Sequence, residues 1–291
     1  MTYSAARVLT VTALGPRLIR IEFEVADTDR LAPPGRADDA VGIYLPRPGE
    51  KDTPPMELRD GVWGYFDLDP VPEGRNYTVR YLDPTTARMT VDVVVHARGP
   101  ATQWARHAAP GDVVAMAHAR GWYRPAPDTQ WQLLVADLAG LPALARILDE
   151  LPGDVPVTAI VEVAERSDLD YLPCPPAVDL VPLVGGNGYG PSGLAAAVRS
   201  VDLPAGRGYC WLAAEASESR AVRKYLRGEC RWHRDQYDII GYWRYDGEEW
   251  SRRYAGYGDD LLAVYRKALA DGKSEKQASE EFDEALERVG L

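Results

Sequence analysis

The sequence predicts two domains of different architecture, an antiparallel β-barrel over residues 1–126 and an α/β domain with a parallel sheet over residues 127–250. The first part repeats short strands of alternating apolar and polar residues, separated by Gly, Pro and Asp, which is typical of small barrels. The second part alternates strands with amphipathic helices, which indicates crossover connections and parallel strands. A helical extension over residues 251–291 completes the predicted organisation.

The barrel strands are predicted in chain order from this alternation. Ile19, Ile21 and Phe23 alternate with charged residues, after a turn at Gly15-Pro16. Four further strands follow, over residues 38–46, 75–83, 87–97 and 111–119. The Pro- and Gly-rich segment 46–64 is expected to be a loop that is too polar to enter the core.

The α/β domain is predicted from strands that precede or follow helical patterns. Buried-type strands are expected over residues 131–139, 156–164, 177–185, 208–216 and 237–244, and helices over 141–151, near 191–199 and over 217–229. Pro142 suits the first turn of its helix.

The tail contains two further amphipathic helices. The first is expected over residues 258–272, and Ser274 with Gln277 forms a capping box for the second. Their apolar faces have to be covered, so we expect them to pack on the body of the protein or in an oligomer interface.

Composition excludes several classes of function. The net charge is −11, which disfavours nucleic-acid binding, and no apolar run is long enough for membrane insertion. The N-terminus has no signal-peptide pattern, and three cysteines without metal-type spacing suit a reduced, cytoplasmic protein. The four histidines share no ligand spacing, so no metal site is expected.

The segment 74–83, GRNYTVRYLD, combines side chains that suit a flat anionic ligand. A flavin dinucleotide has a ring on which Tyr77 could stack, a polar N5 edge for the Thr78 hydroxyl, and a diphosphate for Arg75 and Arg80. Strand alternation places Tyr77 on the face opposite Thr78 and Arg80. From this segment alone, a solvated strand explains the pattern equally well.

Later segments add an anion site and a family resemblance. Gly99, Pro100, Ala101 and Thr102 open a helix whose free N–H groups attract phosphate. With the Arg-x-Tyr-Thr-x-Arg segment, this part of the chain resembles the siderophore-interacting proteins, which are FAD-binding ferric-siderophore reductases of the ferredoxin-reductase group. Further motif matches are His96, Gly99, Pro100, Ala101, Trp104, Ala105, Trp211, Glu215, Arg220, Arg223 and the Gly241–Arg244 run.

The resemblance implies an enzyme that passes electrons from NADH or NADPH through FAD to a ferric siderophore. It implies that Tyr77 stacks on the flavin, that Thr78 contacts N5, and that Trp243 and Arg244 lie near the other face of the ring. The implied cofactor-binding residues are Arg75, Tyr77, Thr78, Val79, Arg80, His96, Gly99, Pro100, Ala101, Thr102, Trp104, Asp137, Trp211, Glu215, Arg220 and Arg223.

Two departures from the family pattern leave alternatives open. Leu138 and Ala139 replace a carboxylate and a hydroxyl after Asp137, and residues 118–121 lack the usual Gly-Pro. A flavoenzyme of secondary-metabolite biosynthesis and a flavin-binding scaffold without turnover are therefore alternatives to iron release. His96 also suits a structural role, and Arg220 and Arg223 also suit a solvated helix face. The Gly-rich segment 184–193 lacks P-loop chemistry and is expected to be a loop beside the active site.

Overall fold

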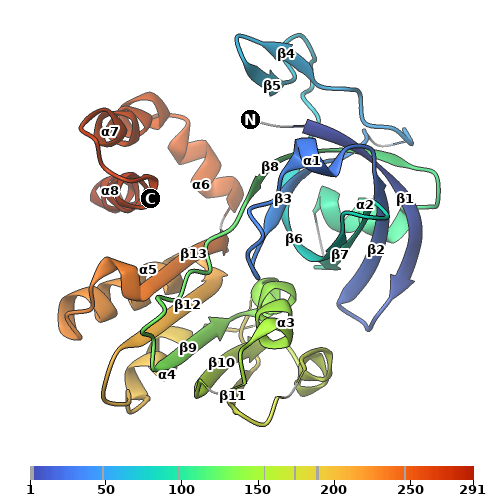
Figure 1. Cartoon of the computed structure of the whole chain (residues 1–291). Coiled ribbons are helices and arrows are strands. Elements are labelled where there is room, and N and C mark those ends of the chain that lie inside the picture. The colour runs from blue at the N-terminus through green and yellow to red at the C-terminus, as the bar shows by residue number, and fades with distance from the viewer. Residues whose placement is uncertain are drawn as a thin grey trace. The chain divides into compact units, whose positions relative to one another are not determined.

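The computed structural model describes residues 3–47, 49–96, 99–153, 155–173, 175–187, 190–245 and 247–291, without the side chain of Glu248. The chain forms two compact units, residues 1–242 and residues 243–291. The first unit contains both a barrel and an α/β sheet, and the second contains helices (Figure 1).

The barrel is closed by six antiparallel strands, as the sequence predicts. In barrel order these are β1 (Tyr3–Ala13), β2 (Leu18–Val25), β7 (Arg88–Val94), β6 (Gly74–Asp83), β3 (Ala40–Tyr44) and β8 (Val113–Arg120). Alternation decides which side chains enter its core, because Ile21, Phe23 and Val25 are buried while Glu24 is exposed. Two short helices accompany the barrel, α1 (Thr28–Leu31) and α2 (Pro100–His107).

The expectation of a polar loop over residues 46–64 is wrong in two respects. Residues 57–64 form a hairpin of β4 (Glu57–Arg59) and β5 (Val62–Gly64), whose turn has positive φ at Asp60 and Gly61. Met56 is buried and packs against Ala115 and Ala117 of the barrel. Met56 therefore holds this mostly polar segment to the barrel, which the overall composition of the segment did not indicate.

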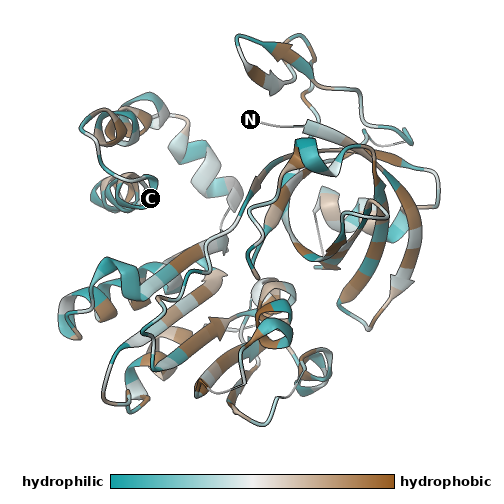
Figure 2. Ribbon diagram, viewed as in Figure 1, coloured by the Kyte–Doolittle hydropathy of each residue, from teal (hydrophilic) through white to brown (hydrophobic). Residues whose placement is uncertain are grey.

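The α/β part is a five-stranded sheet in the order β11 (Val178–Val184), β10 (Val157–Val163), β9 (Trp131–Ala136), β12 (Gly208–Glu215) and β13 (Tyr237–Trp243). The β11–β10, β10–β9 and β9–β12 pairs are parallel. Trp211 and Ala213 face the cluster that contains α3 (Leu141–Glu150), whereas Cys210 and Leu212 face the cluster that contains α4 (Leu194–Ser200) and α5 (Ala216–Lys224). Both faces of the sheet are therefore apolar (Figure 2).

The predicted helices of this domain are confirmed, with short additions that the sequence pattern did not predict. Pro142 lies in the first turn of α3, as expected. The additions are η1 (Leu138–Gly140), η2 (Arg166–Tyr171), the π-helical turn η3 (Tyr225–Glu229) and η4 (Arg234–Gln236).

The second unit consists of α6 (Gly247–Tyr254), α7 (Gly258–Ala270) and α8 (Glu275–Arg288). Its core is formed by Leu261, Ala285, Leu286 and Leu291, with Trp250 stacked on Tyr254 at 4.7 Å between ring centroids. The capping box of Ser274 and Gln277 is present, as predicted. Helix α6 was not predicted, because its sequence is mostly polar. Within the described residues, none of the helices has the length and apolar character that a membrane crossing requires.

Candidate functional site

Strand β6 carries polar side chains on the face opposite Tyr77, and one of them, Arg80, contacts the α/β part of the first unit. Asn76 accepts a hydrogen bond from Arg120, and Arg80 Nη2 lies 2.5 Å from Asp149 Oδ2 on α3. Thr78 lies between them along the strand and is 5% exposed. Tyr77 faces the other way and packs against the barrel core. The strand alternation that separates Tyr77 from Thr78 and Arg80 is therefore present.

The ends of β9 and β12 meet at the edge of the sheet. Asp137 is 1% exposed and follows β9. One of its carboxylate oxygens accepts from the N–H groups of Ala139 and Gly140, at 2.9 and 3.3 Å, and the other accepts from Glu215 N–H at 2.9 Å. The carboxylate thus caps η1 and joins the two strand ends.

Tyr242, near the end of β13, lies at the same edge of the sheet as Asp137. Burial raises the pKa of its hydroxyl. The neighbouring Asp38 and Asp137 raise this pKa further, whereas Thr78 and Arg120 lower it. The end of β13 and the Thr78 side of β6 are therefore neighbours within the first unit.

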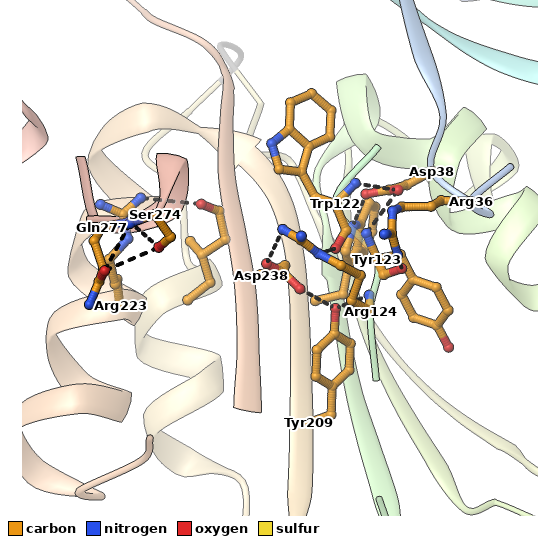
Figure 3. Close-up of polar contacts among 12 residues, drawn as sticks. Arg36, Asp38, Trp122, Tyr123, Arg124, Tyr209, Arg223, Asp238, Ser274 and Gln277 are labelled. Carbon is orange, nitrogen blue, oxygen red and sulfur yellow. Dashed lines mark hydrogen bonds and ion pairs between the residues drawn. The ribbon is translucent and has the colours of Figure 1, made fainter. Parts of the chain in front are cut away.

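Asp38 is a fully buried carboxylate that connects the barrel to the sheet (Figure 3). It accepts hydrogen bonds from the backbone N–H groups of Trp122 and Tyr123, at 2.8 and 2.9 Å. Its second oxygen accepts from Trp211 Nε1–H at 2.9 Å. Burial raises its pKa, although the three hydrogen bonds oppose the shift.

The adjacent Asp39 is equally buried, and its Oδ2 accepts from Gly35 N–H at 2.8 Å. Its Oδ1 lies where a side chain on Gly121 would be, because a Cβ at that position would approach it to 2.5 Å. The backbone of Asp39 also accepts from Val79 N–H at 2.7 Å. This contact fixes β6 against the start of β3.

A second polar network joins the barrel to η2 and α3. Arg20 forms a bidentate pair with Asp92, at 2.8 and 2.7 Å, and the Tyr171 hydroxyl donates to Asp92 at 2.6 Å. Arg146 on α3 donates to the carbonyl of Val79 at 2.8 Å. Both backbone polar groups of Val79 are thus engaged by protein, so β6 is held from two sides.

The predicted phosphate segment has the backbone that an anion site needs. Gly99 has φ 122°, a conformation that favours glycine, and Pro100 follows as the first residue of α2. Thr102 accepts from His96 N–H at 3.0 Å, so its hydroxyl fixes the entry to the helix. The helix has no side-chain cap, and the N–H groups of its first turn lack helical acceptors. Ala97 and Arg98 lie outside the described residues.

Several predicted residues on the α/β side bond to protein. Trp211 is fully buried and bonds to Asp38, and Glu215 caps α5 by accepting from Ser217 N–H at 2.5 Å. Arg223 on α5 donates from Nη2 to the carbonyl of Ile239 at 3.2 Å, and Arg220 lies on the same helix. Contact of these residues with a cofactor stays a prediction.

The remaining predicted residues are the first and the last two of the predicted site in chain order, Arg75, Trp243 and Arg244. Arg75 is exposed and pairs with Glu73 at 3.0 Å. Trp243 and Arg244 belong to the second unit, where the Arg244 guanidinium lies over the Trp250 ring at 4.3 Å. Their predicted place near the flavin stays a prediction.

The residues around β6 and α2 fit an absent polar cofactor. Among the described residues, buried polar atoms without a hydrogen-bond partner include Asp39 Oδ1, Arg80 Nε, Trp104 Nε1 and Tyr242 Oη. Buried polar groups normally have partners, so such atoms call for an explanation. Arg80 lies on β6 and Trp104 on α2, the two elements that the sequence assigns to FAD, whereas the same kind of atom occurs elsewhere in Arg47, Trp131, Asn187 and Trp250.

The Gly-rich segment folds over the end of β10. Gly186 packs on the buried Glu162, because a Cβ there would approach the Glu162 carboxylate carbon to 2.3 Å. Asn187, with φ 60°, accepts from Leu138 N–H at 2.9 Å. Gly188 and Tyr189 of this segment lie outside the described residues.

Sequence reasoning missed the acidic and tyrosine residues that join the two parts. Asp92 stands alone within an apolar strand, and Asp38 and Asp39 stand before one. An isolated acidic residue within or just before an apolar strand could have indicated these contacts, because a buried carboxylate needs hydrogen-bond partners. Tyr171 and Tyr242 carried no comparable signal. Within the described part of the chain, no three His, Cys, Asp or Glu side chains gather as metal ligands would.

Comparisons with known proteins assign this architecture to a family. A model described as the siderophore-interacting FAD-binding domain matches residues 7–123, and one described as siderophore-interacting protein matches residues 129–246. The NADPH-dependent ferric-chelate reductase of Escherichia coli is 28% identical over 204 residues, which cover 69% of this chain and 75% of that protein.

Solved structures agree with this assignment. The siderophore-interacting protein from Acinetobacter baumannii has a TM-score of 0.71 at 22% identity and covers 90% of this chain and 100% of its own. A siderophore utilization protein from T. fusca has a TM-score of 0.69 at 28% identity and covers 83% and 92%. Since the two family models follow one another over the barrel and the sheet, the chain belongs to the siderophore-interacting protein family of FAD-dependent oxidoreductases.

Proposed function

We propose that this protein passes electrons from NADH or NADPH through FAD to a ferric siderophore, so that Fe(II) is released. The observation that carries the proposal is the position of β6, whose Thr78 side faces the sheet edge where Asp137 and Tyr242 lie. Parallel sheets bind ligands at the carboxyl ends of their strands, so a flavin on β6 would lie beside a dinucleotide on the sheet.

The chain's own residues would bind and orient the cofactor. Because Tyr77 and Thr78 face opposite sides of β6, one flavin would contact both across a twisted end of the strand, where Tyr77 would support the ring and Thr78 would contact N5. Arg80 would contact the phosphates together with the first turn of α2. The FAD, when bound, supplies hydride acceptance and single-electron transfer. The ferric ion is the substrate's metal, and transfer to it through the chelate needs no ligand from the protein.

Arg80 has two competing partners in this proposal. Its Nη2 already pairs with Asp149, while its Nε has no partner among the described residues. If Arg80 also serves FAD, then Asp149→Asn, which removes the protein partner, should retain FAD, whereas Arg80→Ala should lose it. Loss of FAD in both variants would assign Arg80 a structural role only.

Binding of FAD, on which the proposed activity and its alternatives all depend, is tested by the visible spectrum of the protein after reconstitution with FAD. Tyr77→Ala should weaken FAD retention, and the matched control is Tyr81→Ala, because Tyr81 is a 60% exposed tyrosine on the same strand. Equal retention of FAD by both variants would contradict the assignment of Tyr77.

Turnover separates the proposed activity from its alternatives. Anaerobic NADPH or NADH should bleach the flavin, and a ferric hydroxamate or catecholate with an Fe(II) trap should then restore its colour. A flavin that stays oxidised would indicate a binding scaffold. A flavin that is reduced but does not reduce ferric chelates would indicate an organic substrate.

We also propose that the protein works in the cytoplasm, where reduced nicotinamides are supplied, and that its helical second unit contributes to an oligomer. In the described part of the chain Cys210 and Cys230 are both in the thiol form, which suits a reducing compartment. Sedimentation equilibrium of the full chain tests the oligomer, and a monomer at micromolar concentration would contradict it.

A further inference from the structure

Three helices of the α/β part begin at the carboxyl edge of the parallel sheet, where a bound dinucleotide commonly places its diphosphate on a free helix N-terminus. They are α3 after β9, α4 after β11 and α5 after β12. At each of these three starts, carboxylates of the chain itself already accept hydrogen bonds from the backbone. The N–H groups that would recognise a diphosphate are thus engaged by protein.

Asp137 covers the turn η1 that leads into α3. Its Oδ1 accepts from the N–H groups of Ala139 and Gly140, at 2.9 and 3.3 Å. The N–H group of Leu138, the first residue of this turn, donates to Asn187 Oδ1 at 2.9 Å. Asp137 and Asn187 are both buried. A phosphate at this turn would have to displace two buried side chains and would be repelled by the charge of one of them.

The start of α5 is capped by Glu215. Its Oε2 accepts from Ser217 N–H at 2.5 Å, and its own N–H donates to Asp137 Oδ2 at 2.9 Å. The caps of α3 and α5 therefore form one connected network across the ends of β9 and β12.

Two more carboxylates engage the backbone at the start of α4. Glu162 Oε1, from a side chain that is 2% exposed, accepts from Gly193 N–H at 2.7 Å. Glu218, in the first turn of α5, accepts from Ala195 N–H at 2.7 Å. With Asp137 and Glu215, four carboxylates face the helix starts along this edge, so a further anion there is disfavoured electrostatically.

Helix α2 beside the barrel has the opposite arrangement. Within the described residues, no side chain caps this helix and no acidic residue lies in its first turn, which opens on Gly99 and Pro100. An uncapped helix start without acidic neighbours favours an anion. The first unit therefore favours a diphosphate at α2, where the proposed function places that of FAD, and disfavours a second one at the sheet edge.

We infer that the four carboxylates set the electron-donor specificity of this reductase by keeping the diphosphate of the electron donor off the helix starts of the sheet. The inference rests on the proposed function, in which a reduced nicotinamide supplies the electrons. The protein then recognises the nicotinamide end of its electron donor, and the ADP part contributes little to binding. The class of electron donor is accordingly reduced nicotinamides in general, including the mononucleotide, which has no diphosphate.

The first test compares reduced nicotinamide mononucleotide with NADH and NADPH as electron donors to the FAD-loaded protein, in anaerobic stopped-flow measurements. We expect the second-order rate constants of flavin reduction to agree within about threefold, which is less than one hydrogen bond to a charged group contributes. A diphosphate held by even one such bond would favour the dinucleotides by roughly 10- to 100-fold. A preference of that size would overturn the inference and leave the proposed function intact.

The second test measures binding without turnover, by calorimetric titration of the FAD-loaded protein with ADP-ribose, which carries the diphosphate but no nicotinamide. The wild type should bind it only weakly. In Asp137→Ala three N–H groups lose their carboxylate acceptor, so the dissociation constant should fall by about tenfold. The matched control is Asp112→Ala, which removes a carboxylate that accepts from Ala109 N–H at 2.9 Å in the barrel and should bind ADP-ribose as the wild type does.

Glu215→Ala, which frees Ser217 N–H at the start of α5, replaces Asp137→Ala if that variant does not fold. Tight binding of ADP-ribose by the wild type, for example through the arginines of α5, would overturn the inference. An unchanged dissociation constant in the folded variant would also overturn it. A wild-type flavin that no reduced nicotinamide bleaches would overturn the proposed function and the inference with it.

Discussion

Asp92 offers the strongest test of how the barrel is joined to the α/β part. Its side chain is 0% exposed and accepts three hydrogen bonds, two from Arg20 and one from Tyr171. The substitution Asp92→Asn keeps the shape of the side chain but removes its charge. The amide nitrogen would then face an Arg20 N–H, so one charge-assisted bond is replaced by two opposed donors.

The size of the effect follows from these contacts. A hydrogen bond to a charged group contributes roughly 1.5–3 kcal/mol, and removing one partner of a buried pair costs about 3–5 kcal/mol. The Arg20 side chain is 35% exposed, so water would partly replace the hydrogen bonds that its guanidinium loses. We therefore expect Asp92→Asn to lower the free energy of unfolding by about 2–4 kcal/mol. For a unit of this size that is a fall in Tm of roughly 4–16 °C.

Urea titration of the FAD-loaded protein, followed by tryptophan fluorescence, measures this loss. The control is Glu24→Gln, since Glu24 pairs with Arg7 at 3.5 Å and both side chains are more than half exposed. That exposed pair should contribute less than about 0.5 kcal/mol. Equal stability of the two variants would refute the argument that the Asp92 network joins the barrel to η2.

Three further predictions concern a close contact, a cap and a buried acid. Gly140→Ala should destabilise the protein by about 1–3 kcal/mol in thermal unfolding, because the new Cβ would lie 2.3 Å from the Ala213 carbonyl oxygen; a wild-type Tm would contradict this. Ser274→Ala should cost the second unit about 1 kcal/mol in urea titration by removing the capping box with Gln277, and an unchanged helical signal and midpoint would contradict that. Burial raises the pKa of Asp38, so folding favours its protonated form and its contribution to stability is lost as pH rises from about 4 through the raised value. Asp38→Asn should therefore remove this part of the fall in unfolding free energy above pH 4, and an unchanged pH slope would argue against it.

Strand alternation predicted the barrel core because the direction of each side chain there depends only on its neighbours in the same strand. Whether Phe23 faces inward depends on its neighbours in β2, and period-two patterning records that. The same rule correctly separated Tyr77 from Thr78. It failed for Met56, because the residue that anchors a mostly polar segment is chosen by a distant surface, Ala115 and Ala117.

The buried acids could not be placed from sequence for a similar reason. Asp38 is stabilised by N–H groups of Trp122 and Tyr123 and by the indole of Trp211, all far along the chain. Before folding, nothing distinguishes it from an exposed acid ahead of a strand. The buried position is affordable only because three donors converge on it.

The Gly-Tyr-Trp-Arg run shows how a motif identifies a family without assigning a role to each residue. The resemblance assigns roles to Trp243 and Arg244, whereas the buried hydroxyl without a hydrogen-bond partner among the described residues belongs to Tyr242. The facing is set by Gly241, where a Cβ would lie 3.1 Å from both Cα and Cβ of Ala216. That close approach brings β13 against the start of α5, so the alternate residues Ile240 and Tyr242 face the opposite side of the sheet, toward the α3 cluster. The glycine therefore allows β13 to pack against α5, a role that a pattern search scoring only the aromatic and charged letters has no means of seeing.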